Sequence, residues 1–111
     1  MKTVLDEGVP RDLAKMLRAV GCPVDEFPNG WKGMKNGALL ALIEEAGFDC
    51  LVTCDKSMEW QQSLKNRKIA VLVLPQKLAE LALIVEVIAD AIGRAKSGVV
   101  MRVQKRPIVR R

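Results

Sequence analysis

The chain has 111 residues, half of them hydrophobic, which suffices for one domain with a substantial core and excludes a disordered segment. It carries 18 Lys and Arg, 13 Asp and Glu, and no histidine, giving a net charge of +5. The absence of histidine excludes Ser-His-Asp and Cys-His nucleophiles and histidine-type zinc sites. The three cysteines show no metal-binding spacing. Chemistry in this chain therefore depends on carboxylates, lysines, hydroxyls or a hard metal ion.

The chain opens on a short apolar run over residues 3–6, which predicts a buried strand ending at Asp6. Pro10 suits the first turn of a helix, and Gly21 suits its end. The apolar residues between them follow helical spacing; they are Leu13, Met16, Leu17 and Val20.

A short strand over 23–27 and a glycine-containing loop over 28–37 come next. The loop matches neither a Walker pattern nor a dinucleotide fingerprint, so it predicts no nucleotide site. Asn36 is a candidate cap for a second helix, which Gly47 ends. The residues expected to face the core in this helix are Leu39, Leu40 and Ile43.

The second half of the chain repeats the alternation of strand and helix. Residues 50–54 predict a strand that runs into Asp55, and Ser57 is a candidate cap for a helix through about Asn66. Residues 69–74 predict another buried strand.

A long helix over 77–96 and an edge strand over 99–103 complete the pattern, with Gly98 between them. The apolar side of the helix comprises Leu78, Leu81, Ile84, Val85, Ile88 and Ile92. This order predicts an α/β protein, a three-layer α/β/α sandwich with a mainly parallel sheet. We expect one domain over 1–103 and a basic tail over 104–111.

The carboxylates at the ends of two predicted strands, Asp6 and Asp55, are the main chemical signal. Carboxyl ends of parallel strands meet at one edge of a sheet, where ligands bind. Two carboxylates there suit Mg²⁺ or Mn²⁺, which can activate water and neutralise charge on a phosphodiester. Lys56 lies beside Asp55 and can pair with a phosphate oxygen. The alternative is that both acids simply end strands or cap helices.

Charge is unevenly distributed, because residues 91–111 hold seven Lys and Arg and no acid. Such a segment suits attraction to a polyanion such as RNA, and equally a solvated tail. The candidate RNA-binding residues within it are Lys105, Arg106, Arg110 and Arg111. Trp31 and Trp60 are candidates either for stacking on bases or for packing in the core.

Three segments resemble a PIN-like domain family of bacteria. The opening is Leu5-Asp6-Glu7-Gly8-Val9-Pro10, and the middle motif is Gly30-Trp31-x-Gly33-x-Lys35-Asn36-Gly37-x-Leu39-Leu40. The third runs from Val52-Thr53-Cys54-Asp55-Lys56 through Gln61-Gln62-x-Leu64 to Asn66-Arg67-Lys68-Ile69-Ala70-Val71. The resemblance covers roughly residues 3–75, with the motifs in the family's order.

The resemblance implies a PIN-like fold related to metal-dependent ribonucleases, which often serve as toxins in bacterial toxin–antitoxin pairs. It implies Asp6 and Asp55 as catalytic metal ligands and Glu7 as a neighbouring catalytic acid. The chain departs from the family at Gly8, where an amide residue is usual. It also departs at residues 36–38, which lack the family's further acid, while Glu44 and Glu45 come two turns later.

Three hypotheses follow. The first is a metal-dependent endoribonuclease with RNA as substrate and an antitoxin protein as partner. The second is an interaction module with an impaired site, favoured by the missing acid at 36–38. The third, a phospho-acceptor receiver domain, fits less well because the strand ending at Leu74 lacks the required hydroxyl residue. We expect a cytoplasmic protein without membrane association, and a homodimer if the last helix exposes apolar surface.

Overall fold

The computed structural model describes residues 2–55, 60, 63–65, 67–74 and 84–103. Within these residues it has four β-strands, three α-helices and one short 3₁₀-helix. In chain order they are β1 (Thr3–Leu5), α1 (Asp12–Ala19), η1 (Asn29–Trp31), α2 (Asn36–Glu45), β2 (Cys50–Thr53), β3 (Ala70–Val73), α5 (Val85–Gly93) and β4 (Val100–Arg102). None of the helices in this part of the chain has the length and apolar character that crossing a bilayer requires.

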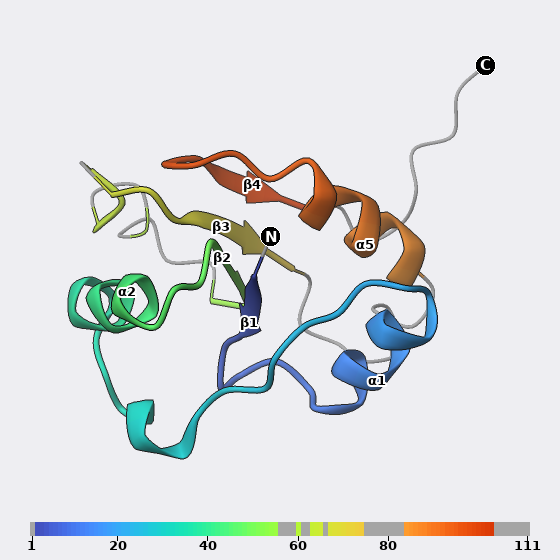
Figure 1. The fold of residues 1–111 in the computed structure, drawn as a ribbon, viewed down its shortest axis with the longest axis horizontal. Helices are drawn as coiled ribbons and strands as arrows, with labels where there is room; N and C mark the ends of the chain where they lie inside the picture. Colours follow the sequence, from blue (N-terminus) through green and yellow to red (C-terminus); the bar gives the residue numbers. More distant parts are fainter. Residues whose placement is uncertain (1, 56–59, 61–62, 66, 75–83, 104–111) are drawn as a thin grey trace.

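The four strands form one parallel sheet in the order β1-β2-β3-β4 (Figure 1). In the register, Leu5 lies opposite Val52, which in turn lies opposite Leu72. Parallel pairing requires a crossover between successive strands, and the intervening segments provide it. The predicted α/β class with a parallel sheet is confirmed, and all carboxyl ends of the strands lie at the same edge.

Between β1 and β2 the chain passes from one side of β1 to the other, so that the order of the strands reverses at β1. The segment predicted as a strand over 23–27 forms only one parallel bridge, in which Asp25 pairs with Val4. Asp25 exchanges hydrogen bonds with Thr3 and Leu5, whereas the next amide, that of Asp6, donates to Val52 of β2. Since successive amides of a strand point to opposite sides, Asp25 and β2 flank β1 on opposite sides. Ligand sites of open α/β sheets lie at such a reversal.

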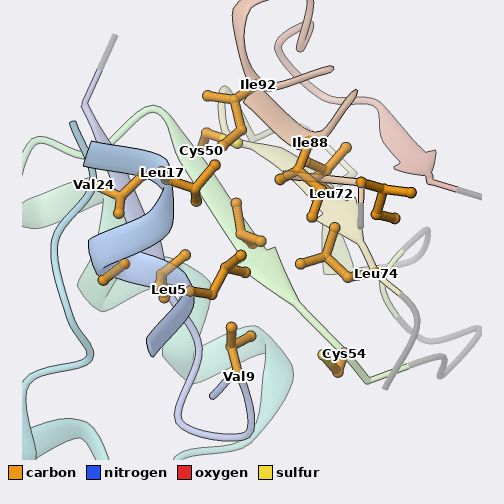
Figure 2. Packing of buried hydrophobic residues seen from close by; sticks show 14 of the residues in the cluster. Leu5, Val9, Leu17, Val24, Cys50, Cys54, Leu72, Leu74, Ile88 and Ile92 are labelled. Carbon is orange, nitrogen blue, oxygen red and sulfur yellow. The ribbon is translucent and has the colours of Figure 1, made fainter. Parts of the chain in front are cut away.

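Two hydrophobic clusters fill the two faces of the sheet, because successive residues of each buried strand point to opposite sides. One cluster packs α1 and α5 against the sheet, and Figure 2 shows part of it. The other packs α2 against the opposite face. Strand residues of the first cluster are Leu5, Cys50, Val52, Ala70 and Leu72. Those of the second are Val4, Leu51, Val71 and Val73. This layering is that of an α/β sandwich.

The helix boundaries differ slightly from the sequence-based expectations. Helix α1 begins at Asp12 rather than at Pro10, and Val20, expected to face the core, is 40% exposed at its C-cap. Gly21 adopts φ 84°, the left-handed conformation that glycine favours at the end of a helix. Asn36 is the first helical residue of α2, and the N-cap is Lys35. Asn36 was therefore wrongly predicted as a cap.

The second half of the fold follows the predicted pattern where it is described. Ile84, Ile88 and Ile92 are buried, as the periodicity predicts. Strand β4 pairs with β3 in parallel register. Residues 77–83 of the predicted long helix, the Ser57 cap and the tail over 104–111 lie outside the described residues.

Candidate functional site

Asp6 begins a tight turn directly after β1. Its N–H continues the sheet ladder by donating to the Val52 carbonyl at 2.8 Å, and its own carbonyl accepts the Val9 N–H at 3.0 Å. Its carboxylate Oδ1 accepts the N–H of Glu7 at 2.9 Å. The side chain is half-buried. Both its backbone and one carboxylate oxygen are therefore held by local hydrogen bonds.

Thr53, the last residue of β2, connects the two predicted acids. Its hydroxyl Oγ1 donates to Asp6 Oδ2 at 2.7 Å and accepts the Asp55 N–H at 3.0 Å. An amide N–H can only donate, so the hydroxyl proton must point to the Asp6 carboxylate, which acts as the acceptor. Thr53 is fully buried, and its hydroxyl lies between the Asp6 carboxylate and the Asp55 amide.

Asp55 is exposed, and its backbone is held on both sides. The N–H donates to Thr53, and the carbonyl accepts the indole Nε1–H of Trp60 at 3.0 Å. Trp60 is only 1% exposed, so it anchors the segment after β2 to the core. Of the two alternatives for Trp60, its burial confirms packing in the core and excludes stacking on a base.

Asp6 and Asp55 line one open depression of about 280 Å³ at the carboxyl ends of β1 and β2, together with Gly8, Thr53 and Cys54. In Figure 2, Cys54 and Val9 lie at the lower margin of the core cluster, next to this edge. The structure thus brings the two predicted ligands to the same hollow. Two like charges there repel each other, and a cation between them would relieve this repulsion.

The number of carboxylates at the depression limits which metal ion it can hold. Among the described residues, no three Cys, Asp, Glu or His side chains gather closely enough to hold a metal ion. Mg²⁺ commonly binds through one or two carboxylates and keeps several waters or substrate oxygens as its other ligands. Two carboxylates in an open depression, one of them held by neutral hydrogen-bond donors in the part of the chain that the structure describes, fit that mode of binding.

Glu7, the other predicted acid, lies in the turn after β1, and its side chain does not line the depression that Asp6 and Asp55 share. It lines a separate depression of about 180 Å³, which Asp6 also borders. Its Oε1 accepts the N–H of Gly33 at 3.3 Å, which connects the turn after β1 to the loop before α2. Gly33 has φ 82°, a conformation that few other residues adopt. Glu7 therefore neighbours the Asp6–Asp55 depression without lining it.

Glu44, which lies two turns into α2, belongs to the opposite edge of the sheet. Its carboxylate accepts the Arg67 guanidinium at 2.8 Å and the Lys68 N–H at 3.0 Å, just before β3 begins. The Lys68 backbone hydrogen bond, helped by the Arg67 side chain, holds the pKa of Glu44 below its usual value. Glu44 does not replace the acid that residues 36–38 lack.

Cys22 and Cys50 are reduced thiols that do not line the depression shared by Asp6 and Asp55. Burial raises the pKa of the Cys50 thiol to about 12, and burial also raises the pKa of Cys22. Both thiols therefore stay protonated at neutral pH and behave as small apolar groups.

Sequence reasoning missed the role of Thr53 and the residues of the second depression. A threonine at the end of an apolar strand is common in a protein core. The only feature of the sequence that pointed to a role for Thr53 in the site was the carboxylate two residues later. The predicted RNA-contacting residues lie outside the described part of the chain: Lys56, Lys105, Arg106, Arg110 and Arg111.

Comparisons of the chain with protein-family models, with curated proteins and with solved structures found no match.

Proposed function

We propose that the protein is a Mg²⁺- or Mn²⁺-dependent endoribonuclease with a PIN-like fold. The observation that carries this proposal is the depression that Asp6 and Asp55 share at the carboxyl ends of β1 and β2. It lies where the strand order reverses, which is the usual ligand position in open α/β sheets. The resemblance to the PIN-like family supports the proposal, because Asp6 and Asp55 match the acidic positions that it implies as metal ligands.

In this proposal Asp6 and Asp55 hold the metal ion, which when bound supplies charge neutralisation at a phosphodiester and lowers the pKa of water. Thr53 is a positioning residue, because its hydroxyl orients the Asp6 carboxylate. Trp60 keeps the Asp55 backbone at the site by anchoring its carbonyl. Glu7 borders the site from the neighbouring depression.

RNA attraction is assigned to the lysine that follows Asp55 in the sequence and to the basic residues of the tail: Lys56, Lys105, Arg106, Arg110 and Arg111. Each phosphate contact releases counterions, so removing residues 104–111 should lower RNA affinity and flatten its dependence on salt. An unchanged salt dependence would exclude the tail from RNA binding. As a toxin-type nuclease, the protein would have an antitoxin protein as its partner.

The test is cleavage of a panel of single-stranded RNAs with Mn²⁺, with Mg²⁺ and with EDTA. Wild-type protein should cleave only with a metal ion, and Asp6→Asn and Asp55→Asn should abolish cleavage. Asp49→Asn is the matched control, because Asp49 precedes β2 at the opposite edge and accepts the Lys2 N–H at 2.8 Å. Equal cleavage by all four proteins would contradict the proposal.

The second candidate is a PIN-like interaction module whose site does not cleave. The observation that favours it is the engagement of Glu44 by Arg67 and Lys68, because this acid does not complete the site. Residues 36–38 contain no carboxylate either. Metal binding that depends on Asp6 and Asp55, together with intact RNA over the whole panel, would favour this candidate.

A further inference from the structure

The second depression adjoins the proposed metal site, because Asp6 borders both hollows. Its volume is about 180 Å³, well above the space that one water molecule needs. It is smaller than the roughly 300–1,000 Å³ typical of pockets for whole drug-sized ligands. A ligand fragment about the size of one planar ring system therefore suits this hollow better than a complete nucleotide does.

The lining of the second depression has three chemical components. Leu5 and Val9 are buried apolar residues, and Phe27 adds a half-buried aromatic ring. The exposed cations Arg11 and Lys32 stand beside them. Two carboxylates, Glu7 and Glu26, complete the lining with Asp6. The hollow thus combines an aromatic side chain with two cations and three carboxylates, which are hydrogen-bond acceptors.

The aromatic ring is fixed by its neighbours. Phe27 and Trp31 meet edge to face, with ring centroids 6.0 Å apart and an interplanar angle of 82°. Trp31 meets Phe48 in the same way at 6.1 Å. Such contacts hold the ring of Phe27 in place, and a fixed ring at the side of a hollow is a surface on which a nucleobase can stack.

We propose that the second depression binds one unpaired base of the RNA, next to the phosphodiester that lies at Asp6 and Asp55. This inference rests on the proposed function for its substrate class, RNA, and does not require cleavage. The base stacks on Phe27, and Arg11 and Lys32 attract the flanking phosphates. The base must be unpaired, because a base inside an A-form helix cannot enter a hollow of this kind.

The carboxylates give the hollow a preference among bases. Glu7 Oε1 already accepts the Gly33 N–H, so Glu26 is the acceptor assigned to the base. A carboxylate accepts a hydrogen bond from an exocyclic amino group, which cytosine has and uracil lacks. The hollow should therefore prefer cytosine to uracil, two bases of the same ring size.

The test is equilibrium binding of fluorescently labelled oligocytidine and oligouridine, measured by anisotropy in EDTA so that neither metal nor cleavage contributes. Wild-type protein should bind the cytidine oligomer about tenfold more tightly. Glu26→Gln should remove most of this preference. Glu86→Gln is the matched control, because Glu86 is exposed on α5, and it should bind like wild type.

Two further variants probe the other components. Phe27→Leu keeps an apolar side chain and removes the aromatic face, so both oligomers should bind at least about fivefold more weakly. Lys32→Ala should weaken both oligomers equally and reduce the salt slope by about one. Lys15→Ala removes an exposed positive charge from α1, outside the depression, and is the control for the loss of one positive charge in Lys32→Ala. Thermal melting at the assay conditions confirms that each variant is folded.

Equal affinity of wild-type protein for both oligomers, or full preference in Glu26→Gln, would overturn the inference. If metal-dependent cleavage is nevertheless found, the nuclease proposal stands without the base site. If the cytidine preference depends on Glu26 while no RNA is cleaved, the base site stands and the nuclease proposal fails.

Discussion

Two acidic side chains at opposite edges of the sheet are held in different ways. At the amino ends of the strands, Glu44 accepts a guanidinium and a backbone amide, and its pKa is lowered. At the carboxyl ends, Asp6 accepts a hydroxyl and a backbone amide, both of them neutral donors. No Lys or Arg among the described residues forms an ion pair with Asp6.

This difference separates a structural acid from a candidate functional acid. The Glu44 charge is compensated within the fold, where it connects α2 to the start of β3. The Asp6 carboxylate is oriented by neutral donors, forms no ion pair among the described residues, and lies beside a second carboxylate in an open hollow.

The largest expected effect is on cleavage. Asp6→Asn keeps the size of the side chain and removes its charge, so metal-dependent RNA cleavage should fall by at least about 100-fold. Glu44→Gln should cleave like wild type, because Glu44 lies at the other edge. The measurement is the rate of RNA cleavage under saturating Mn²⁺. A comparable loss in both variants would contradict the separation of the two acids.

The next effect concerns the residue that orients Asp6. Thr53→Val keeps the shape and removes the hydroxyl that joins Asp6 to the Asp55 amide, so Mn²⁺ should bind about tenfold more weakly. Thr53→Ser retains a hydroxyl and should restore most of the affinity. Calorimetric titration with Mn²⁺ measures both. Equal Mn²⁺ affinity of the valine and serine variants would show that the Thr53 hydroxyl does not contribute to metal binding.

A smaller effect is expected on stability at the amino-end edge. Glu44→Gln and Arg67→Ala should each lower the free energy of unfolding by about 1 kcal/mol, since the pair is partly exposed. The double variant should lose less than the sum, because the two residues share one interaction. Urea unfolding gives these values. Strictly additive losses would show that the ion pair contributes nothing of its own.

The smallest effect is the dependence of this stability on pH. The pKa of Glu44 is lowered in the folded protein, so its contribution is complete above the unfolded value near 4.5 and is lost as pH falls through the folded value. The stability difference between wild type and Glu44→Gln should therefore shrink from pH 5 downward. Thermal melting across acidic pH tests this. A difference that stays constant down to pH 3 would contradict it.

The placement of the two acids was predictable, whereas their coupling was not. Apolar runs that end on Asp6 and lead into Asp55 specify neighbouring parallel strands, and parallel pairing fixes their common edge. The link through Thr53 depends on the rotamer of one buried hydroxyl, which the carboxylate two residues later does not specify. The second depression depends on the loop that places Phe27 and Lys32 beside the turn after β1, which is a tertiary arrangement.

The local differences between the predicted and the observed elements also have physical causes. Asp25 makes a single bridge instead of a strand, because the adjacent polar residues Asp25 and Glu26 interrupt any period-2 apolar face. Val20 fits the helical spacing but falls at the C-cap, beyond the last turn that packs on the sheet. Periodicity predicts which face of a helix is buried, but the end of the packed surface is set by the neighbouring elements.

The most direct test of the central claim is a Mn²⁺ titration followed by melting temperature, comparing wild type with Asp6→Asn, Asp55→Asn and Asp49→Asn. Wild type and Asp49→Asn should gain melting temperature as Mn²⁺ rises to millimolar concentration, because an ion that binds only the folded state stabilises it. The Asp6 and Asp55 variants should gain none. A wild-type melting temperature that does not change with Mn²⁺, or one that rises equally in all four proteins, would contradict a metal site at these two carboxylates.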